Sequence, residues 1–249
     1  IMTMKQVILN DKVFALVAKM QAELNTTVKL SNTSKLGVKS WSLQALSTCP
    51  ASLDDNGNLV DACKGCYATS GNYRYSNVRA SREFNKQAWQ DDNFINDFID
   101  ALDNERYFRW FDSGDMYSIK LAEKIYQIMK LTPHVKHWLP TRMYKFPKFH
   151  NIIKKMQALD NVVVRLSSDS ISAEIVSSDI VDTNSTIVHE SKIDDLDNSI
   201  KVCSAYYNEG KCLKCRDCYD KDVKTVAYVA HGLSMKKQYK TKLINTVSV

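Results

Sequence analysis

The seven cysteines of this 249-residue chain fall into two groups that lie far apart in the sequence. The first group has three members and the second has four: Cys49, Cys63 and Cys66, then Cys203, Cys212, Cys215 and Cys218. Four thiolates complete the coordination of a 4Fe-4S cluster, whereas three leave one iron open to another ligand. The sequence therefore predicts two 4Fe-4S clusters, of which the first is open and binds a small molecule.

Zinc and disulfides are the alternative uses of these cysteines. The C-x2-C spacing also suits a tetrahedral zinc site, so zinc stays open as the metal of the second group. A structural zinc at the first group would need a fourth ligand that the neighbouring sequence does not offer, whereas an open cluster explains its absence. The odd number of cysteines, with no apolar signal segment before them, argues against disulfides. Reduced thiols indicate a cytoplasmic protein.

The composition is that of an ordinary globular protein, with 44% apolar and 25% charged residues. No run of about 18 apolar residues is present, which argues against a membrane-spanning helix. The net charge is +6, and lysines gather near the end of the chain at Lys236, Lys237, Lys240 and Lys242. Such a run is typical of a solvated face. It supports an alternative function, a non-enzymatic metal-binding module, with zinc or structural clusters, that binds nucleic acid or a host protein.

Strand-like and helix-like segments alternate through most of the chain. The hydrophobic periodicity predicts strands at 41–46, 107–111, 137–139, 161–166, 186–189 and 225–230, and helices at 78–102, 118–129 and 149–159. Strands separated by helices indicate a parallel sheet with right-handed crossovers. The predicted fold class is therefore α/β, in the form of a partial (β/α)6 barrel with an irregular, cysteine-rich C-terminal insertion.

This fold divides the chain into four parts. An N-terminal extension covers 1–40, the barrel core covers 41–170 and 225–233, a cysteine-rich subdomain covers 171–224, and a basic tail covers 234–249. The four-cysteine site would tie the ends of the subdomain together. An electron relay is the alternative role of that site.

Polar motifs follow the predicted strands, at the edge where α/β proteins bind ligands. They are Cys49 after the first strand, Ser113, Gly114 and Asp115 after the second, Arg142 after the third, and Ser167 and Asp169 after the fourth. The turn-forming residues between Asp54 and Asn58 favour a hairpin that returns Cys63 to Cys49. We expect these residues to lie together around one open end of the predicted barrel.

Three longer motifs point to a known family. They are CKGCYA at 63–68, FRWFDSGD at 108–115 and VVRLSSD at 163–169. Together they resemble the phage-encoded gene product 88 family, whose function is unassigned, over about residues 42–232. This resemblance implies a phage protein that acts in the host cytoplasm, and it implies no activity.

A broader similarity is to radical S-adenosylmethionine (SAM) enzymes, which are partial (β/α)6 barrels with a three-cysteine cluster after the first strand. It implies an enzyme of unknown substrate and electron donor, in which the open cluster cleaves SAM to a 5'-deoxyadenosyl radical. The implied cluster ligands are Cys49, Cys63 and Cys66, and the implied SAM contacts are Ser113, Gly114, Asp115, Arg165, Ser167 and Asp169. The spacing C-x13-C-x2-C departs from the usual C-x3-C-x2-C of those enzymes.

Overall fold

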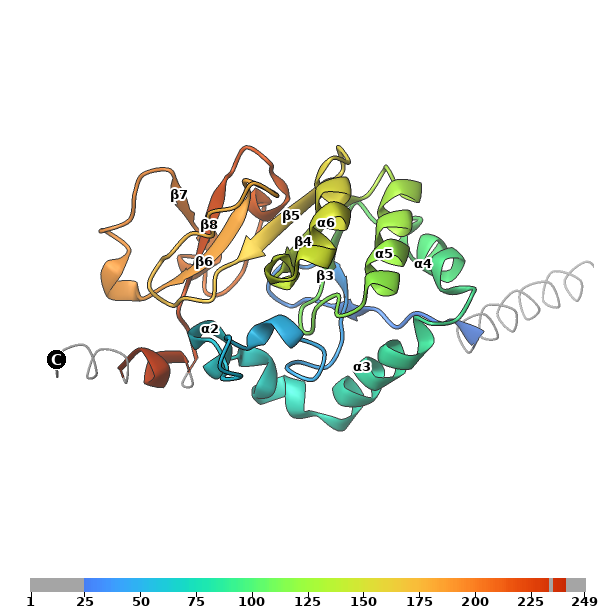
Figure 1. The fold of residues 1–249 in the computed structure, drawn as a ribbon, viewed down its shortest axis with the longest axis horizontal. Helices are drawn as coiled ribbons and strands as arrows, with labels where there is room; N and C mark the ends of the chain where they lie inside the picture. The colour runs from blue at the N-terminus through green and yellow to red at the C-terminus, as the bar shows by residue number, and fades with distance from the viewer. Residues whose placement is uncertain (1–24, 233–234, 241–249) are drawn as a thin grey trace, which may run out of the picture.

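One eight-stranded sheet organises the computed structural model, which describes residues 25–232 and 235–240 (Figure 1). The strands follow the order β1-β2-β3-β4-β5-β6-β8-β7, and the pairing is parallel except between β1 and β2. Their bounds are β1 (Ser31–Asn32), β2 (Lys39–Trp41), β3 (Tyr107–Trp110), β4 (Lys136–Thr141), β5 (Val162–Ser167), β6 (Asn184–Val188), β7 (Ile200–Val202) and β8 (Thr225–Val229). The α/β class and the mostly parallel sheet are thus confirmed.

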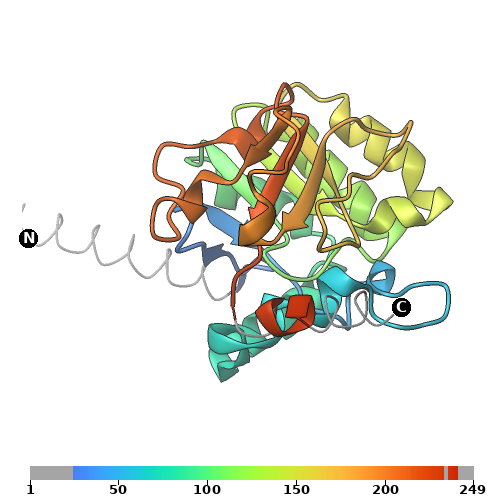
Figure 2. The same cartoon turned by 90° about the vertical axis from the view of Figure 1, so that its left-hand side faces the viewer.

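The helices lie mainly in the first two thirds of the described chain. They are α2 (Asp61–Lys64), α3 (Ser76–Ala88), α4 (Phe94–Leu102), α5 (Ile119–Leu131) and α6 (His150–Gln157). Short 3₁₀ helices occupy Pro50–Ser52, Tyr67–Thr69, Gly71–Arg74, Met143–Lys145, Pro147–Phe149, Glu190–Lys192, Ser204–Tyr206 and Asp217–Tyr219. Residues 235–240 are helical, and this segment lies beside α2 in both views of the ribbon (Figures 1 and 2).

The main core lies between the sheet and the layer formed by α4, α5 and α6. Helix α5 buries Leu121, Ala122, Ile125 and Met129, the face that the periodicity predicts. Against it, the Phe98 ring of α4 stacks on Trp110 of β3 with ring centroids 4.8 Å apart. Burial of such large side chains is the main favourable contribution to folding. This core fixes the strands from which the polar loops emerge.

Two element boundaries differ from the sequence prediction. The first long strand ends at Trp41 instead of Leu46, because Leu43 N–H bonds to the Ser113 carbonyl and Leu46 takes a left-handed φ of 64°. The predicted helix at 78–102 is two helices, α3 and α4. Its break is stabilised by the Lys124 ammonium, which donates to the carbonyls of Trp89 and Asp91 at 3.0 and 2.7 Å.

The two halves of the sheet are connected differently. Helices lie in the crossovers that precede β5, whereas the described chain between β5 and β8 contains 3₁₀ helices and loops. The strands β6 and β7, which fall in the predicted insertion, belong to the same sheet as the rest. The six-unit partial barrel is therefore not confirmed, and the division into domains stays a prediction.

None of the described helices has both the length and the apolar character needed to cross a membrane.

Candidate thiol site at the carboxyl edge of the sheet

A hairpin closes the long gap between Cys49 and Cys63, as the sequence predicts. Leu53 and Leu59 form an antiparallel bridge at its base. At its tip, the Asp54 carboxylate accepts hydrogen bonds from the backbone N–H groups of Asn56 and Asn58, at 2.9 and 2.8 Å. An Asp side chain that bonds to its own following backbone in this way stabilises a turn. The hairpin thus brings the two segments of the first cysteine group together.

Cys63 and Cys66 lie at the two ends of one tight turn. The Cys66 N–H donates to the Cys63 carbonyl over 3.2 Å, which is an i to i+3 bond at the end of α2. Such a turn holds its end Cα atoms within about 7 Å, close to the span of a disulfide. Inside the turn, Gly65 lies against Met235, because a Cβ on this glycine would meet the Met235 Cα at 3.0 Å. The helical segment 235–240 therefore packs directly on the turn.

Tyr67 anchors this turn to the end of β3. Its hydroxyl donates to the Asp112 carbonyl over 2.6 Å and accepts from an Arg109 Nη2 at 3.2 Å. Arg109 also forms an ion pair with the Asp112 carboxylate at 3.0 Å. The Cys66 side of the turn is thus fixed to the loop that follows β3.

A group of charged side chains lies beside the thiols. Asp169, after β5, forms ion pairs with Arg142 Nε at 3.2 Å and with Lys145 Nζ at 2.8 Å. Lys145 also donates to the Ala51 and Leu53 carbonyls at 3.2 and 2.8 Å, which ties it to the segment just after Cys49. Residues that follow β4 and β5 therefore meet the cysteine hairpin at the carboxyl edge, as predicted.

Burial raises the pKa of all three thiols. It raises the pKa of Cys49 to about 12, helped by the nearby Asp115 and by Cys63 and Cys66. Burial also raises the pKa of Cys63, against the lowering effect of the Arg142 guanidinium. The pKa of Cys66 is raised by burial as well, although the Ala68 backbone N–H and Arg142 oppose the shift. The three thiols are thus close enough to act on one another's ionisation.

The polar side chains of the loop after β3, Ser113-Gly114-Asp115, bind other parts of the protein. The Ser113 hydroxyl donates to the Leu43 carbonyl at 2.6 Å. Gly114 has φ 81°, and a Cβ there would lie 2.6 Å from the Leu43 Cβ. The Asp115 carboxylate accepts from the Thr141 hydroxyl at 2.8 Å and from the backbone N–H of Arg142 at 2.9 Å. A SAM contact by this loop stays a prediction.

Arg165 lies elsewhere, under the second cysteine group. Its side chain is fully buried, and its guanidinium donates to carbonyls of the segment that carries Cys218. The acceptors are Asp217, Cys218, Asp220, Val223, Asn184 and Lys224, at 2.7 to 3.5 Å. Ser167 instead meets Ser185 on the neighbouring strand, with 3.2 Å between hydroxyls. The structure brings only Asp169 of these three residues to the cysteine trio.

The four later cysteines form a second group of neighbouring thiols. The Cys215 N–H donates to the Cys212 carbonyl at 2.9 Å, the same turn bond as in the first group. Cys203 acts on the ionisation of both Cys212 and Cys218. Burial raises the pKa of Cys218 to about 11, although its thiol lies 3.2 Å from the Tyr228 hydroxyl. All seven cysteines are free.

Comparison with known proteins decides the relationship that the three motifs suggest. The model of the Gene product 88 family matches residues 15–245, nearly the whole chain. The chain belongs to the Gene product 88 family. The comparisons with curated proteins and with solved structures found no match. The predicted resemblance to this phage family is thus confirmed, whereas the resemblance to radical SAM enzymes has no support.

The predicted iron–sulfur function of this Gene product 88 protein is wrong. Over residues 25–232 and 235–240, no group of three or more His, Cys, Asp or Glu side chains could hold a metal ion. The open cluster, the second cluster and the alternative of a zinc or structural metal module are overturned together. SAM binding, as a separate expectation, stays a prediction.

The lysine-rich tail is only partly within the described residues of this Gene product 88 protein. Lys236 lies 4.0 Å from the Glu190 carboxylate, whereas Lys242 falls outside the described residues. Binding of nucleic acid stays a prediction, as does the cytoplasmic location.

Sequence reasoning missed Lys145, because its partners lie 24 and more residues away and leave no local pattern.

Proposed function

We propose that this protein takes part in thiol–disulfide redox chemistry through Cys49, Cys63 and Cys66. The observation that carries the proposal is the placement of Cys49 beside a turn that brings the Cα atoms of Cys63 and Cys66 within about 7 Å, near the span of a disulfide. The thiols lie at the carboxyl edge of a parallel sheet, where α/β proteins place their sites. All three are free, so the reduced form of the proposed cycle is the one described.

Cys66 is best suited to react first. It is partly exposed, whereas Cys63 is 8% exposed. The Ala68 N–H and Arg142 both favour its thiolate, against the effect of burial. The Cys66 thiolate attacks a small-molecule disulfide and releases one thiolate of it. Cys63 then attacks the Cys66 sulfur and releases the second. Two protein thiols are thus oxidised, one external disulfide is reduced to two thiols, and the two thiol protons go to the released thiolates.

The test is direct identification of the disulfide. Reduced protein is treated with a small-molecule disulfide, its remaining thiols are alkylated, and linked peptides are identified by mass spectrometry. We expect a Cys63–Cys66 link that a dithiol reductant removes. Cys66→Ser should decrease the reversible oxidation of Cys63 at least about tenfold, because the attacking thiol is lost.

Cys203→Ser is the matched control, since it removes one thiol outside the trio and should leave the link unchanged. Cys49→Ser is informative in a second way, because the Cys63–Cys66 link should still form without the third thiol. If Cys63 and Cys66 both stay free while mixed disulfides with the small thiol accumulate on other cysteines of the chain, the proposal is wrong.

The reactivity of the trio should rise steeply with pH. A thiol with a raised pKa is protonated at neutral pH, so its thiolate fraction grows about tenfold for each pH unit below the pKa. Alkylation of Cys49 by iodoacetamide should still be increasing above pH 10, because its pKa is raised to about 12. Arg142→Gln should slow alkylation of Cys63, because Arg142 lowers the pKa of that thiol.

Arg142→Lys, which keeps the positive charge, is the control for this pH experiment. Peptide-resolved alkylation rates between pH 6 and 11 provide the measurement. A rate at Cys49 that reaches its plateau near pH 8 would contradict the raised pKa.

A further inference from the structure

The second cysteine group contains an exposed turn with the dimensions of a disulfide. The Cys215 N–H to Cys212 carbonyl bond of 2.9 Å closes the turn, which places the two Cα atoms within about 7 Å. Between them, Leu213 is 63% exposed and takes a left-handed φ of 48°, a conformation that is costly for a side chain with a Cβ. Such strain is found more often at functional sites than elsewhere.

Positive charge surrounds this turn. The Arg216 guanidinium is held over it, since Nη1 donates to the Leu213 carbonyl at 2.9 Å and to the Cys215 carbonyl at 2.7 Å. Lys35 lies next to the turn, because the Cys212 N–H donates to the Lys35 carbonyl at 2.8 Å. Both cations lower the pKa of Cys212, whose thiol burial otherwise raises.

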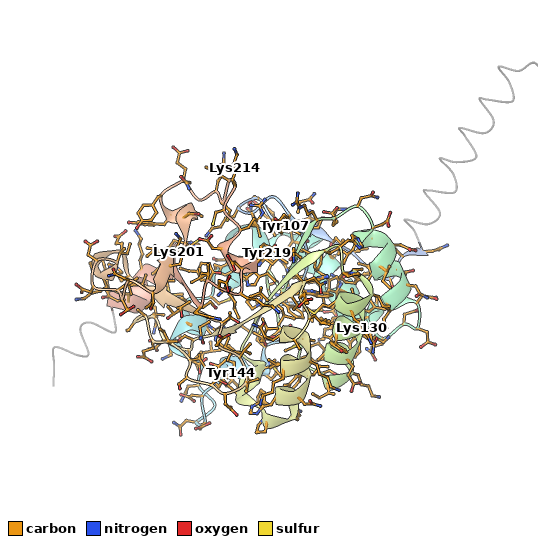
Figure 3. All side chains as sticks on the ribbon, turned by 90° about the horizontal axis from the view of Figure 1, so that it is seen from above. Tyr107, Lys130, Tyr144, Lys201, Lys214 and Tyr219 are labelled. Carbon is orange, nitrogen blue, oxygen red and sulfur yellow. The ribbon has the colours of Figure 1, made fainter. Side chains whose placement is uncertain are left out.

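The other charged residues between 209 and 217 leave the net charge around the turn positive. Lys211 and Lys214 are exposed on either side of Cys212. Figure 3 shows Lys214 at the edge of the molecule above Tyr107 and Tyr219, on the side opposite Tyr144. The acidic residues between 209 and 217 are Glu209 and Asp217. Residues 209–217 thus carry three basic and two acidic side chains, and Lys35 adds a fourth basic one.

The chain beyond the turn is held rigidly. Arg165 fixes the backbone from Asp217 to Lys224 through its carbonyls, and the Cys218 thiol contacts the Tyr228 hydroxyl. The turn itself is attached to this base but projects from it, with Leu213 and Lys214 in solvent. A thiol pair on a rigid base with an open side can be reached by an external disulfide.

We propose that Cys212 and Cys215 form a second dithiol, separate from the trio, that reacts selectively with anionic disulfides. The Cys212 thiolate attacks the disulfide and releases one thiolate, and Cys215 then attacks the Cys212 sulfur and releases the second. The two protons of the protein thiols go to the two released thiolates, so the reaction forms one protein disulfide and reduces one external disulfide to two thiols. The cationic surroundings attract the anionic substrate and repel a cationic one.

The experiment compares two disulfide probes of opposite charge on the full chain. Glutathione disulfide is anionic at neutral pH and cystamine is cationic. Oxidation of Cys212 and Cys215 is followed by quenching, alkylation and peptide mass spectrometry. After correction for each probe's rate with a neutral model thiol, we expect glutathione disulfide to react about tenfold faster at low salt, with a ratio that falls as salt is added.

Two variants and a control make the assignment specific. Lys35→Gln and Arg216→Gln should each decrease the ratio severalfold, because each removes a cation next to Cys212. Lys201→Gln removes an exposed lysine on β7 and should leave the ratio unchanged. Lys35→Gln keeps the backbone hydrogen bond to Cys212, and residue 35 lies outside the turn. A disturbed turn would therefore not explain its result.

The outcomes separate this inference from the proposed function of the trio. A Cys212–Cys215 link with no preference for the anionic probe, or no link at all, overturns the inference even if Cys63 and Cys66 are oxidised. A charge-selective link at Cys212–Cys215 supports it even if the trio stays reduced.

Discussion

Replacement of Arg165 by Met is expected to lower the free energy of unfolding by about 3 to 5 kcal/mol. The guanidinium is fully buried and donates to six carbonyls, four of which lie between Asp217 and Val223. Met fills a similar volume but donates no hydrogen bond, so several buried carbonyls would lose their partner. Hydrogen bonds from a charged donor are worth more than neutral ones, which makes the loss large.

Urea unfolding of the wild type and of Arg165→Met provides the measurement, and Arg165→Lys is the matched control. Lysine keeps the charge but has three donors on one nitrogen, so we expect it to recover part of the loss. The Cys212 and Cys218 thiols should also become easier to alkylate in Arg165→Met below its unfolding midpoint, because their base is loosened. A loss of less than about 1 kcal/mol would show that the carbonyls find other partners.

Gly114→Ala is expected to cost about 2 to 4 kcal/mol. The glycine has φ 81°, which a residue with a Cβ adopts only at a cost. The added methyl would also lie 2.6 Å from the Leu43 Cβ and 2.7 Å from the Thr48 hydroxyl, closer than real contacts allow. Both neighbours belong to the segment that leads to Cys49, so the variant should also disturb the first cysteine group.

Gly57→Ala separates the two causes. Gly57 has φ 78°, similar to Gly114, but nothing lies within 4 Å of the position of its Cβ. Gly57→Ala should therefore lower the free energy of unfolding only by the cost of the left-handed φ, about 1 kcal/mol. Thermal or urea unfolding of both variants gives the comparison, and equal losses would show that the contact with Leu43 is relieved by a small shift of the chain.

The regular half of the molecule could be predicted from sequence because its signals are local. The strands at β3, β4 and β5 and the buried face of α5 follow from periodicity alone. The hairpin at Asp54 could be predicted because its turn residues are consecutive in the chain. The break between α3 and α4 could not, because a lysine 33 residues away from Asp91 stabilises it.

The sites were harder to predict because spacing does not report the local environment. The three-plus-four division of the cysteines is visible in the sequence, but the rise in pKa that burial causes depends on the packing around each thiol. Arg165 illustrates the same difficulty. It lies in a motif that matches the family, and sequence reasoning assigned it to a ligand, yet its donors are directed to backbone carbonyls more than 50 residues away.

The strand order has a consequence for how the chain folds. Strand β8 is the last strand in the sequence, yet it lies between β6 and β7, which are made earlier. Because β7 is the edge strand and pairs only with β8, it cannot join the sheet until β8 has paired with β6, and residues 203–224, which connect β7 to β8, cannot take their final path before that step. Non-local parallel pairing of this kind is slow. The four thiols of this connection therefore reach their final surroundings only with that pairing, and a disulfide formed among them too early would constrain the connection before β7 and β8 have paired.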